Sequence, residues 1–222
     1  MDLIELGVPF SDPLADGPVI QAGGQRSLAH GTTVRKILQL VKDVRKHSDI
    51  PLVLMTYLNP IWHYGLARFA AAARQAGVDG IIVPDLPTEE GANIASLMKR
   101  HGLDLIYLLA PTSSASRQRA VAQRSNGFVY YVSLTGVTGL RNRLAGGLAD
   151  QVRAVKKVSR LPVCVGFGVS KPAQARQVSR TADGVIIGTA VVRALHENRK
   201  LSSAQLAKKI ARPFARAMGK GK

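Results

Sequence analysis

The sequence predicts an α/β fold of the (β/α)8 barrel class. Short apolar segments alternate with helical ones at intervals of roughly 22 to 34 residues after the first long unit. The apolar segments are continuous runs, as in parallel strands that are covered on both faces. Seven strand–helix units can be counted in the 222 residues, whereas a complete barrel has eight units in about 250 residues. An open doubly wound sheet is the alternative, but the glycine-ended turns after the last strands favour the barrel.

The chain opens on an apolar strand that carries an acid. In residues 3–6 the side chains alternate, so that Leu3 and Glu5 share one face and Ile4 and Leu6 share the other. A carboxylate in such a strand costs free energy unless it is paired or used. Glycine, proline and aspartate then follow densely, and residues 8–31 are expected to form a long loop. An acid near the end of a strand, followed by a long loop, is typical of an active site.

The remaining segments alternate as a barrel requires. Helices are predicted where apolar residues recur at helical spacing, or where alanine-rich stretches end at glycine. They cover residues 32–46, 66–76, 88–101, 116–124, 148–158, 171–180, 190–197 and, interrupted near Pro213, 202–218. Strands are predicted for the apolar runs at 51–56, 80–83, 105–109, 128–132, 162–165 and 184–187. We expect a barrel domain over residues 1–198 and a basic C-terminal helix and tail over 199–222.

Composition limits the classes of function. The formal net charge is +17, and residues 199–222 hold eight Lys or Arg and no acid. Nucleic-acid binding is the alternative that this charge raises, but no aromatic residues for base stacking are interleaved with it apart from Phe214. The five histidines show no ligand spacing, so we expect no metal site. A single cysteine, no long apolar run and no signal peptide predict a cytoplasmic protein without a membrane span.

Three glycine-rich turns follow strands in the second half of the chain, at residues 136–139, 166–168 and 188–189. Glycine lets backbone N–H groups approach an anion closely, and the third turn opens a helix, whose N-terminus favours phosphate. In barrels the phosphate site lies after the last two strands. A phosphorylated substrate is therefore predicted, with the loop at 133–147 as a lid over it.

The acids allow more than one interpretation. Asp16 lies eleven residues after Glu5, and two carboxylates in one site can divide acid–base work and charge stabilisation between them. Asp16 can equally be a turn residue before Gly17, and spacing alone does not decide. For Asp85 we favour the turn. Tyr130 is predicted in a strand, where a tyrosine can serve the core or face the barrel interior.

Taken together, the motifs resemble the tryptophan synthase alpha chain family. The stretch IELGVPFSDPLADGPVIQ at residues 4–21 is similar to the family's signature. Further segments support it in the same order: LMTYLNPI (54–61), PDLP (84–87), LAPTS (109–113), SLTGVTG (133–139), VGFGVS (165–170) and IIGTA (186–190). The similarity runs from residue 2 to about residue 198.

The resemblance implies a (β/α)8 barrel that cleaves indole-3-glycerol phosphate into indole and glyceraldehyde 3-phosphate. Glu5 matches the family's catalytic glutamate, the acid/base that protonates the indole carbon as the C–C bond breaks. Asp16 matches the loop aspartate that accepts the indole N–H and stabilises the positive charge developing on the ring. Tyr130 matches the pocket tyrosine, which moves its interpretation from core to site.

The same resemblance assigns the phosphate end of the substrate. Gly139, Gly168, Gly188 and Thr189 match the positions whose backbone binds phosphate. Thr138 matches the lid threonine that meets the loop aspartate when the site closes. These assignments agree with the phosphate site that the glycine-rich turns predict.

A partner is implied as well. In the family, indole passes to a beta chain that carries pyridoxal phosphate, in an alpha2beta2 assembly, and the alpha chain itself needs no cofactor. Asp12, Pro13 and Asn59 match loop positions that face the beta chain.

The sequence departs from the family pattern at its start, because the family's first strand and helix precede residue 1. We therefore expect a barrel that lacks its first βα unit, through truncation or a misplaced start that leaves out roughly 40 residues. The alternative is a catalytically weak or inactive barrel that only docks on the beta chain. A sugar-phosphate isomerase or epimerase is a third class, although such barrels lack the long loop that carries Asp16.

Overall fold

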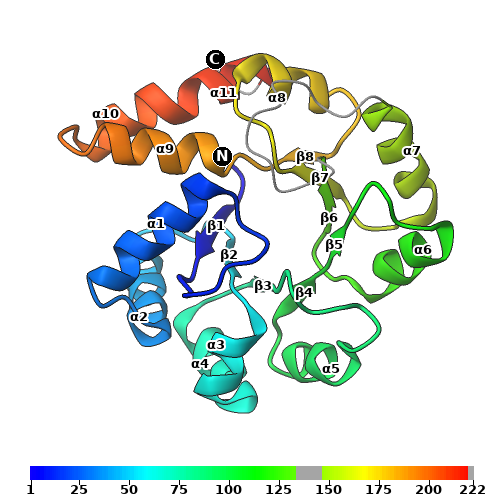
Figure 1. Ribbon diagram of the computed structural model, residues 1–222, viewed down its shortest axis with the longest axis horizontal. Helices are drawn as coiled ribbons and strands as arrows, with labels where there is room; N and C mark the ends of the chain where they lie inside the picture. The colour runs from blue at the N-terminus through cyan, green and yellow to red at the C-terminus, as the bar shows by residue number, and fades with distance from the viewer. Residues whose placement is uncertain (134–146, 220–222) are drawn as a thin grey trace.

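The computed structural model describes residues 1–133 and 147–219. Its strands form a parallel sheet inside a ring of helices, the arrangement of a (β/α)8 barrel (Figure 1). The strands are β1 (Ile4–Gly7), β2 (Leu52–Met55), β3 (Gly80–Ile82), β4 (Asp104–Ile106), β5 (Leu108–Leu109), β6 (Val129–Val132), β7 (Val163–Gly166) and β8 (Gly184–Val185).

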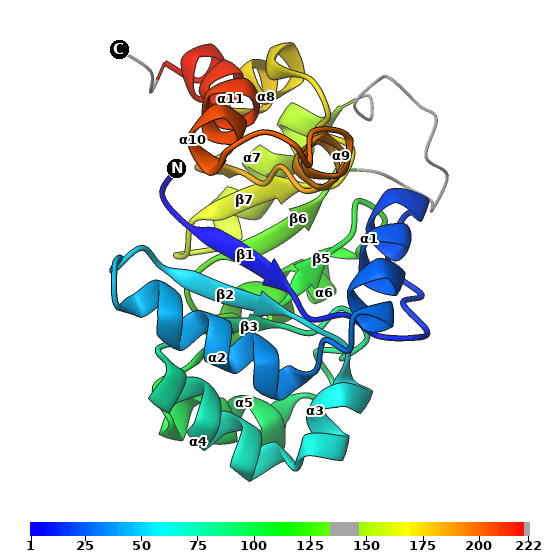
Figure 2. The ribbon, with the colours of Figure 1, turned by 90° about the vertical axis from the view of Figure 1, so that its left-hand side faces the viewer.

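The helices lie outside the strands (Figures 1 and 2). They are α1 (Pro18–Ala29), α2 (Val34–Arg45), α3 (Leu58–Tyr64), α4 (Leu66–Ala76), α5 (Ala92–Arg100), α6 (Ala115–Arg124), α7 (Leu148–Val158), α8 (Pro172–Val178), α9 (Thr189–Glu197), α10 (Ser203–Leu206), a π-helical turn η1 (Ala207–Ala211) and α11 (Arg212–Ala217). No helix in the described ranges is long and apolar enough to cross a membrane.

The strands form two four-stranded parallel sheets, in the orders β1-β2-β3-β4 and β5-β6-β7-β8. One predicted strand, 105–109, is divided at Tyr107 into β4 and β5, yet the ladder continues there, because the N–H of Tyr130 donates to the carbonyl of Tyr107 at 3.2 Å. The described chain thus supplies seven strand positions of the barrel. In these residues β1 pairs with β2 alone and β8 with β7 alone.

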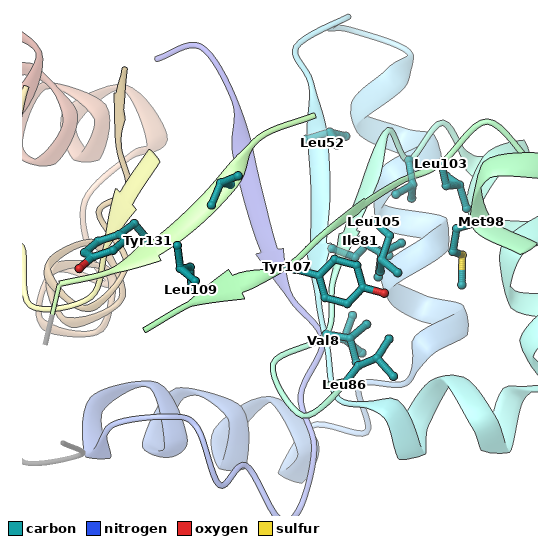
Figure 3. Close-up of a cluster of buried hydrophobic side chains, with 14 of the residues drawn as sticks. Val8, Leu52, Ile81, Leu86, Met98, Leu103, Leu105, Tyr107, Leu109 and Tyr131 are labelled. Carbon is teal, nitrogen blue, oxygen red and sulfur yellow. The ribbon is translucent and has the colours of Figure 1, made fainter. Parts of the chain in front are cut away.

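Alternation along β1 is as the sequence predicts. Ile4 and Leu6 pack against the outer core between sheet and helices, part of which Figure 3 shows around Ile81, Leu105 and Tyr107. Leu3 packs against the second cluster, inside the barrel. Glu5 shares the face of Leu3 and therefore points into the barrel interior.

Two helices fall where the sequence predicted loop. α1 begins at Pro18, which suits the first helical turn because proline has no N–H to leave unpaired. Its Gly23 and Gly24 hide the helical pattern, but Gly23 allows α1 to approach α9, since a Cβ there would lie 3.1 Å from Cγ1 of Val192. The expectation of a continuous loop over residues 8–31 was therefore wrong. α3 was missed because it is short and contains Pro60.

The C-terminal helical segment packs back onto the barrel. Phe214 is buried in the outer core, and α11 packs against α8. The predicted interruption near Pro213 takes the form of η1, a π-helical turn that ends two residues before that proline. Proline cannot donate to the carbonyl four residues earlier, so the regular ladder is broken at this point. A domain boundary at residue 198 stays a prediction.

Two strand pairs share one stabilising device at their N-terminal ends. The carboxylate of Asp79, just before β3, accepts the N–H of Leu52 at 2.8 Å and binds Arg45 of α2 at 2.6 Å. Asp183, just before β8, accepts the N–H of Val163 at 2.9 Å and binds Lys156 of α7 at 2.6 Å. In each case one aspartate ties the preceding strand and helix to the strand that follows.

Candidate active site

Glu5 lies inside the barrel, among mostly apolar side chains. Its backbone is in register with Val53 of β2, which belongs to the interior cluster with Ile82, Ile106 and Tyr130. Its Oε2 atom is shielded from solvent and has no hydrogen-bond partner among the described residues. Burial, with a smaller contribution from the charge of Asp16, raises the pKa of Glu5 to about 7. The carboxyl group can therefore both give and take a proton near neutral pH.

Asp16 is positioned by the loop after β1. Its N–H donates to the carbonyl of Pro13 at 3.1 Å, and its own carbonyl accepts Nε2 of Gln21 at 2.9 Å. Burial raises the pKa of the Asp16 carboxyl, and a hydrogen bond from Tyr57 partly opposes this shift. Because the charge of Asp16 is felt at Glu5, the loop brings the two carboxylates to one site, as the sequence allowed but did not decide.

Tyr57 holds this loop and was not identified from the sequence. It lies two residues after the end of β2 and directly before α3. Its side chain is only 4% exposed and packs against Phe10, with ring centroids 5.5 Å apart. Its hydroxyl oxygen accepts the N–H of Ala15 at 2.9 Å and bonds to Asp16. The only available signal was its place after a strand, and many core tyrosines share that position.

Tyr130 of β6 faces the same interior. Its pKa is raised well above the ordinary value, first by burial and then by the charges of Glu5, Cys164 and Asp16. The phenol is therefore neutral at physiological pH, a hydrogen-bond donor rather than a base. Its ring packs edge-on to Phe167 at 5.6 Å and against the backbone of Gly166, where an added Cβ would overlap the ring.

The predicted phosphate positions lie at the ends of neighbouring strands. Gly168 follows β7 in the left-handed region (φ 75°), next to Phe167 at φ 62°, an uncommon conformation for a residue with a side chain. Ser133 Oγ donates to the Phe167 carbonyl and so fixes this turn. Gly188 and Thr189 follow β8 and open α9. Since β7 pairs with β8, both turns lie at the same end of the barrel.

Thr138 and Gly139 lie outside the described residues, as do residues 134–146 of the predicted lid loop at 133–147.

Of the three predicted interface residues, Asp12 and Pro13 lie in the loop after β1. The expectation of a loop at Asn59 was wrong, because this residue lies in the first turn of α3, which follows β2. Asp12 and Asn59 are exposed, and Pro13 is half-buried. Asp85 lies in a turn after β3, as the sequence predicts, and its carboxylate ties that turn to the start of α3 by accepting the N–H of Leu58 at 2.9 Å.

The site's chemistry is that of carboxyl and phenol groups over an apolar floor. Among the described residues, no group of three or more His, Cys, Asp or Glu side chains is placed to hold a metal ion. The arrangement provides a carboxyl whose pKa lies near neutral pH and a second carboxylate that can face positive charge, with glycine-containing turns at the C-terminal ends of β7 and β8. It suits acid–base cleavage of a substrate that carries phosphate at one end.

Known proteins share this sequence and fold. The chain matches the family described as tryptophan synthase alpha chain over residues 1–219. It is 50% identical over 210 residues to the tryptophan synthase alpha chain of Geobacter sulfurreducens, which covers 95% of this chain and 78% of that protein. The corresponding protein of Citrifermentans bemidjiense is 55% identical over 192 residues, 86% of this chain and 72% of that one.

Solved structures agree. Tryptophan synthase subunit alpha from Legionella pneumophila superposes with a TM-score of 0.89 at 41% identity, over 98% of this chain and 82% of the other. The tryptophan synthase a2b2 complex of Pyrococcus furiosus contains a chain with a TM-score of 0.87 at 37% identity, over 98% of this chain and 86% of the other. The similarity to both spans the strands that carry Glu5 and Tyr130. The chain therefore belongs to the tryptophan synthase alpha chain family.

Proposed function

We propose that this chain is the alpha subunit of a tryptophan synthase and cleaves indole-3-glycerol phosphate to indole and glyceraldehyde 3-phosphate, a carbon–carbon lyase reaction of tryptophan biosynthesis in the cytoplasm. The observation that carries the proposal is the buried Glu5 carboxyl, with a pKa of about 7, beside Asp16 and Tyr130. A retro-aldol cleavage needs this combination, because a proton must reach carbon while positive charge is held nearby.

Glu5 acts first as an acid and then as a base. Its protonated carboxyl delivers a proton to the indole carbon that bears the glycerol side chain. The C–C bond then breaks, its electron pair returns to the ring, and the adjacent side-chain hydroxyl becomes the aldehyde as it loses its proton. The Glu5 carboxylate left by the first step takes that proton, so the residue ends the cycle in its starting state. A pKa near 7 serves both directions.

Asp16 holds the charge that this step creates. Protonation at carbon makes the indole nitrogen more acidic and the ring positive, and an ionised carboxylate that accepts the N–H stabilises it. Tyr57 supports Asp16 in the ionised form through its hydrogen bond. Tyr130 lines the pocket as a neutral phenol against which the aromatic substrate packs.

The phosphate of the substrate lies against the backbone of Gly168, Gly188 and Thr189, together with Gly139. The start of α9 offers free N–H groups and the positive end of the helix dipole. Thr138 closes over the site from the lid. The phosphate then serves as a handle that fixes the indole end against Glu5.

A beta chain is the partner, in an alpha2beta2 assembly, as in the Pyrococcus furiosus complex. The alpha chain needs no cofactor of its own, and pyridoxal phosphate belongs to the beta chain. Asp12 and Pro13, in the loop after β1, and Asn59, in α3, form the docking surface. Two large apolar side chains of the same segments support an interface at this end of the barrel: Leu14 of the loop is 83% exposed and Trp62 of α3 is 64% exposed.

The test is the release of indole from indole-3-glycerol phosphate by the chain, with and without a beta chain, with Glu5→Gln as the control. We expect the chain to form indole, the beta chain to increase the rate of indole formation, and Glu5→Gln to abolish it. Stimulation of the beta chain without indole formation, unchanged by Glu5→Gln, would instead assign the chain a docking role alone. Competition by indolepropanol phosphate separates the proposal from a sugar-phosphate isomerase.

A further inference from the structure

A shallow, open hollow with a strongly basic lining lies at the end of the barrel opposite the candidate active site. It has a volume of about 410 Å³ and is lined by Arg153, Lys156, Lys157, Arg180 and Thr181. The first three come from α7, which leads into β7, and the last two lie between α8 and β8. The hollow therefore lies near the N-terminal ends of these strands, whereas Asp16 and the phosphate turns follow the C-terminal ends of theirs.

Two of the four cations are already paired. Lys156 binds Asp183 at 2.6 Å and the Thr181 carbonyl at 3.3 Å, and Arg153 binds Asp150 at 2.6 Å. These contacts fix the Lys156 ammonium at the wall of the hollow without cancelling the charge of the others.

Lys157 and Arg180 have no hydrogen bond or ion pair with any other part of the chain that the structure describes. The C-termini of α7 and α8 carry about half a negative charge each. Basic side chains near these helix ends offset that charge, which explains why the residues are basic. This does not explain why they converge with Arg153 and Lys156 on one hollow. The lining keeps an excess of positive charge that no described carboxylate meets.

We propose that this hollow binds a small anion that carries two or more linked phosphate groups. An arginine fork and lysine ammonium groups are the usual ligands of phosphate oxygens. No aromatic residue lines the hollow to stack a base, so recognition is of the phosphates themselves. The proposal is independent of the reaction assigned to Glu5.

The test is a calorimetric titration of the full chain with inorganic pyrophosphate at low ionic strength. Excess glycerol 3-phosphate, a monophosphate, is present to fill the proposed substrate site. The variant Lys157→Gln/Arg180→Gln removes the two unpaired cations. The matched control Lys99→Gln/Arg100→Gln removes two exposed cations from the last turn of α5. We expect the dissociation constant to rise roughly ten-fold or more in the first variant and less than about two-fold in the control.

Each other outcome overturns the proposal. Equal titrations for the wild type and the first variant would mean that pyrophosphate binds elsewhere. Equal losses in both double variants would reduce the effect to diffuse surface charge. Binding of a DNA duplex that only the first variant weakens, with no heat from pyrophosphate, would make the face a nucleic-acid surface. All four replaced side chains are exposed, so both variants should fold, and thermal unfolding checks this. Indole formation should be unchanged in both, which keeps this test separate from that of the proposed function.

Discussion

The Tyr57 hydroxyl forms a hydrogen bond with the Asp16 carboxylate and also accepts the N–H of Ala15 at 2.9 Å. One phenol thus fixes both the position and the charge of the loop carboxylate. Tyr57 is not assigned to touch the substrate, so we regard it as a positioning residue.

We expect Tyr57→Phe to lower kcat/KM for indole-3-glycerol phosphate roughly 10- to 100-fold, since a hydrogen bond to a charged group contributes about 1.5–3 kcal/mol. The pKa of Asp16 should rise further, which the pH profile would show. Tyr131→Phe is the matched control, because Tyr131 is also buried and donates to Gln151 at 2.9 Å, but from the outer face of the sheet. Equal effects of the two substitutions would remove the positioning role.

Glu5→Gln should reduce turnover by on the order of 10² to 10⁴, the usual contribution of general acid–base catalysis. Glutamine keeps the shape and burial of Glu5 but cannot exchange a proton. Steady-state indole formation measures the loss, and an unchanged KM would show that binding survives. Near-wild-type turnover would exclude Glu5 as the acid.

The same substitution should make the protein more stable above neutral pH. The folded-state pKa of Glu5, about 7, lies above its unfolded value. The folded state therefore binds more protons between roughly pH 4.5 and 7, and the free energy of unfolding falls as the pH rises through that window. Ionisation of Glu5 lowers the free energy of unfolding by about 3 kcal/mol in total. Urea unfolding of both proteins should show that the free energy of unfolding of Glu5→Gln, relative to that of the wild type, increases with pH up to about pH 7. Above pH 7 the difference should stay constant. A stability difference that does not depend on pH would contradict the explanation that ionisation of the buried Glu5 destabilises the folded state.

Gly166→Ala should damage the pocket through Tyr130. The added Cβ would overlap the Tyr130 ring and contact its hydroxyl, so the ring or strand β7 must move. Overpacking of this kind costs about 1–3 kcal/mol, to be measured by urea unfolding. Activity should fall as the displaced ring enters the substrate's space. Gly166→Ala with Tyr130→Phe gives a second reading, because removing the hydroxyl should relieve part of the cost. No relief would mean that the strain lies elsewhere.

Gly188→Ala should separate binding from folding. A Cβ at Gly188 meets no described atom within 4 Å, and its φ of −97° suits alanine. Stability should therefore stay within roughly 0.5 kcal/mol of the wild type. If the substrate phosphate lies against this backbone, the methyl group occupies its place and KM rises while kcat changes less. Gly24→Ala on α1, where the new Cβ would lie 4.0 Å from Cβ of Pro9, controls for a general glycine effect. An unchanged KM would move the phosphate elsewhere.

Local patterns foretold much of this molecule. Alternation placed Glu5 inside the barrel, because one strand has only two faces, and continuous apolar runs identified the strands. The sequence could not show that Asp16 folds back over Glu5, because that depends on Tyr57 and Gln21, which follow no local rule. The sequence did not predict α1, because Gly23 lowers its helix propensity and is there to let α1 pack closely against α9. Asp85 lies in the predicted turn, but its partner, the N–H of Leu58 at the start of α3, could not be predicted because Leu58 is 27 residues away in the sequence.

The paired devices of Asp79 and Asp183 bear on how the barrel forms. Each carboxylate reaches a strand only 27 or 20 residues back along the chain, so each closes its own strand–helix–strand unit without help from distant sequence. Short-range closure of this kind is associated with fast folding and with cooperative units that open separately. Native-state hydrogen exchange should therefore divide the barrel into at least two blocks, one around β2 and β3 and one around β7 and β8. Asp79→Asn should then loosen the first block and leave the second protected.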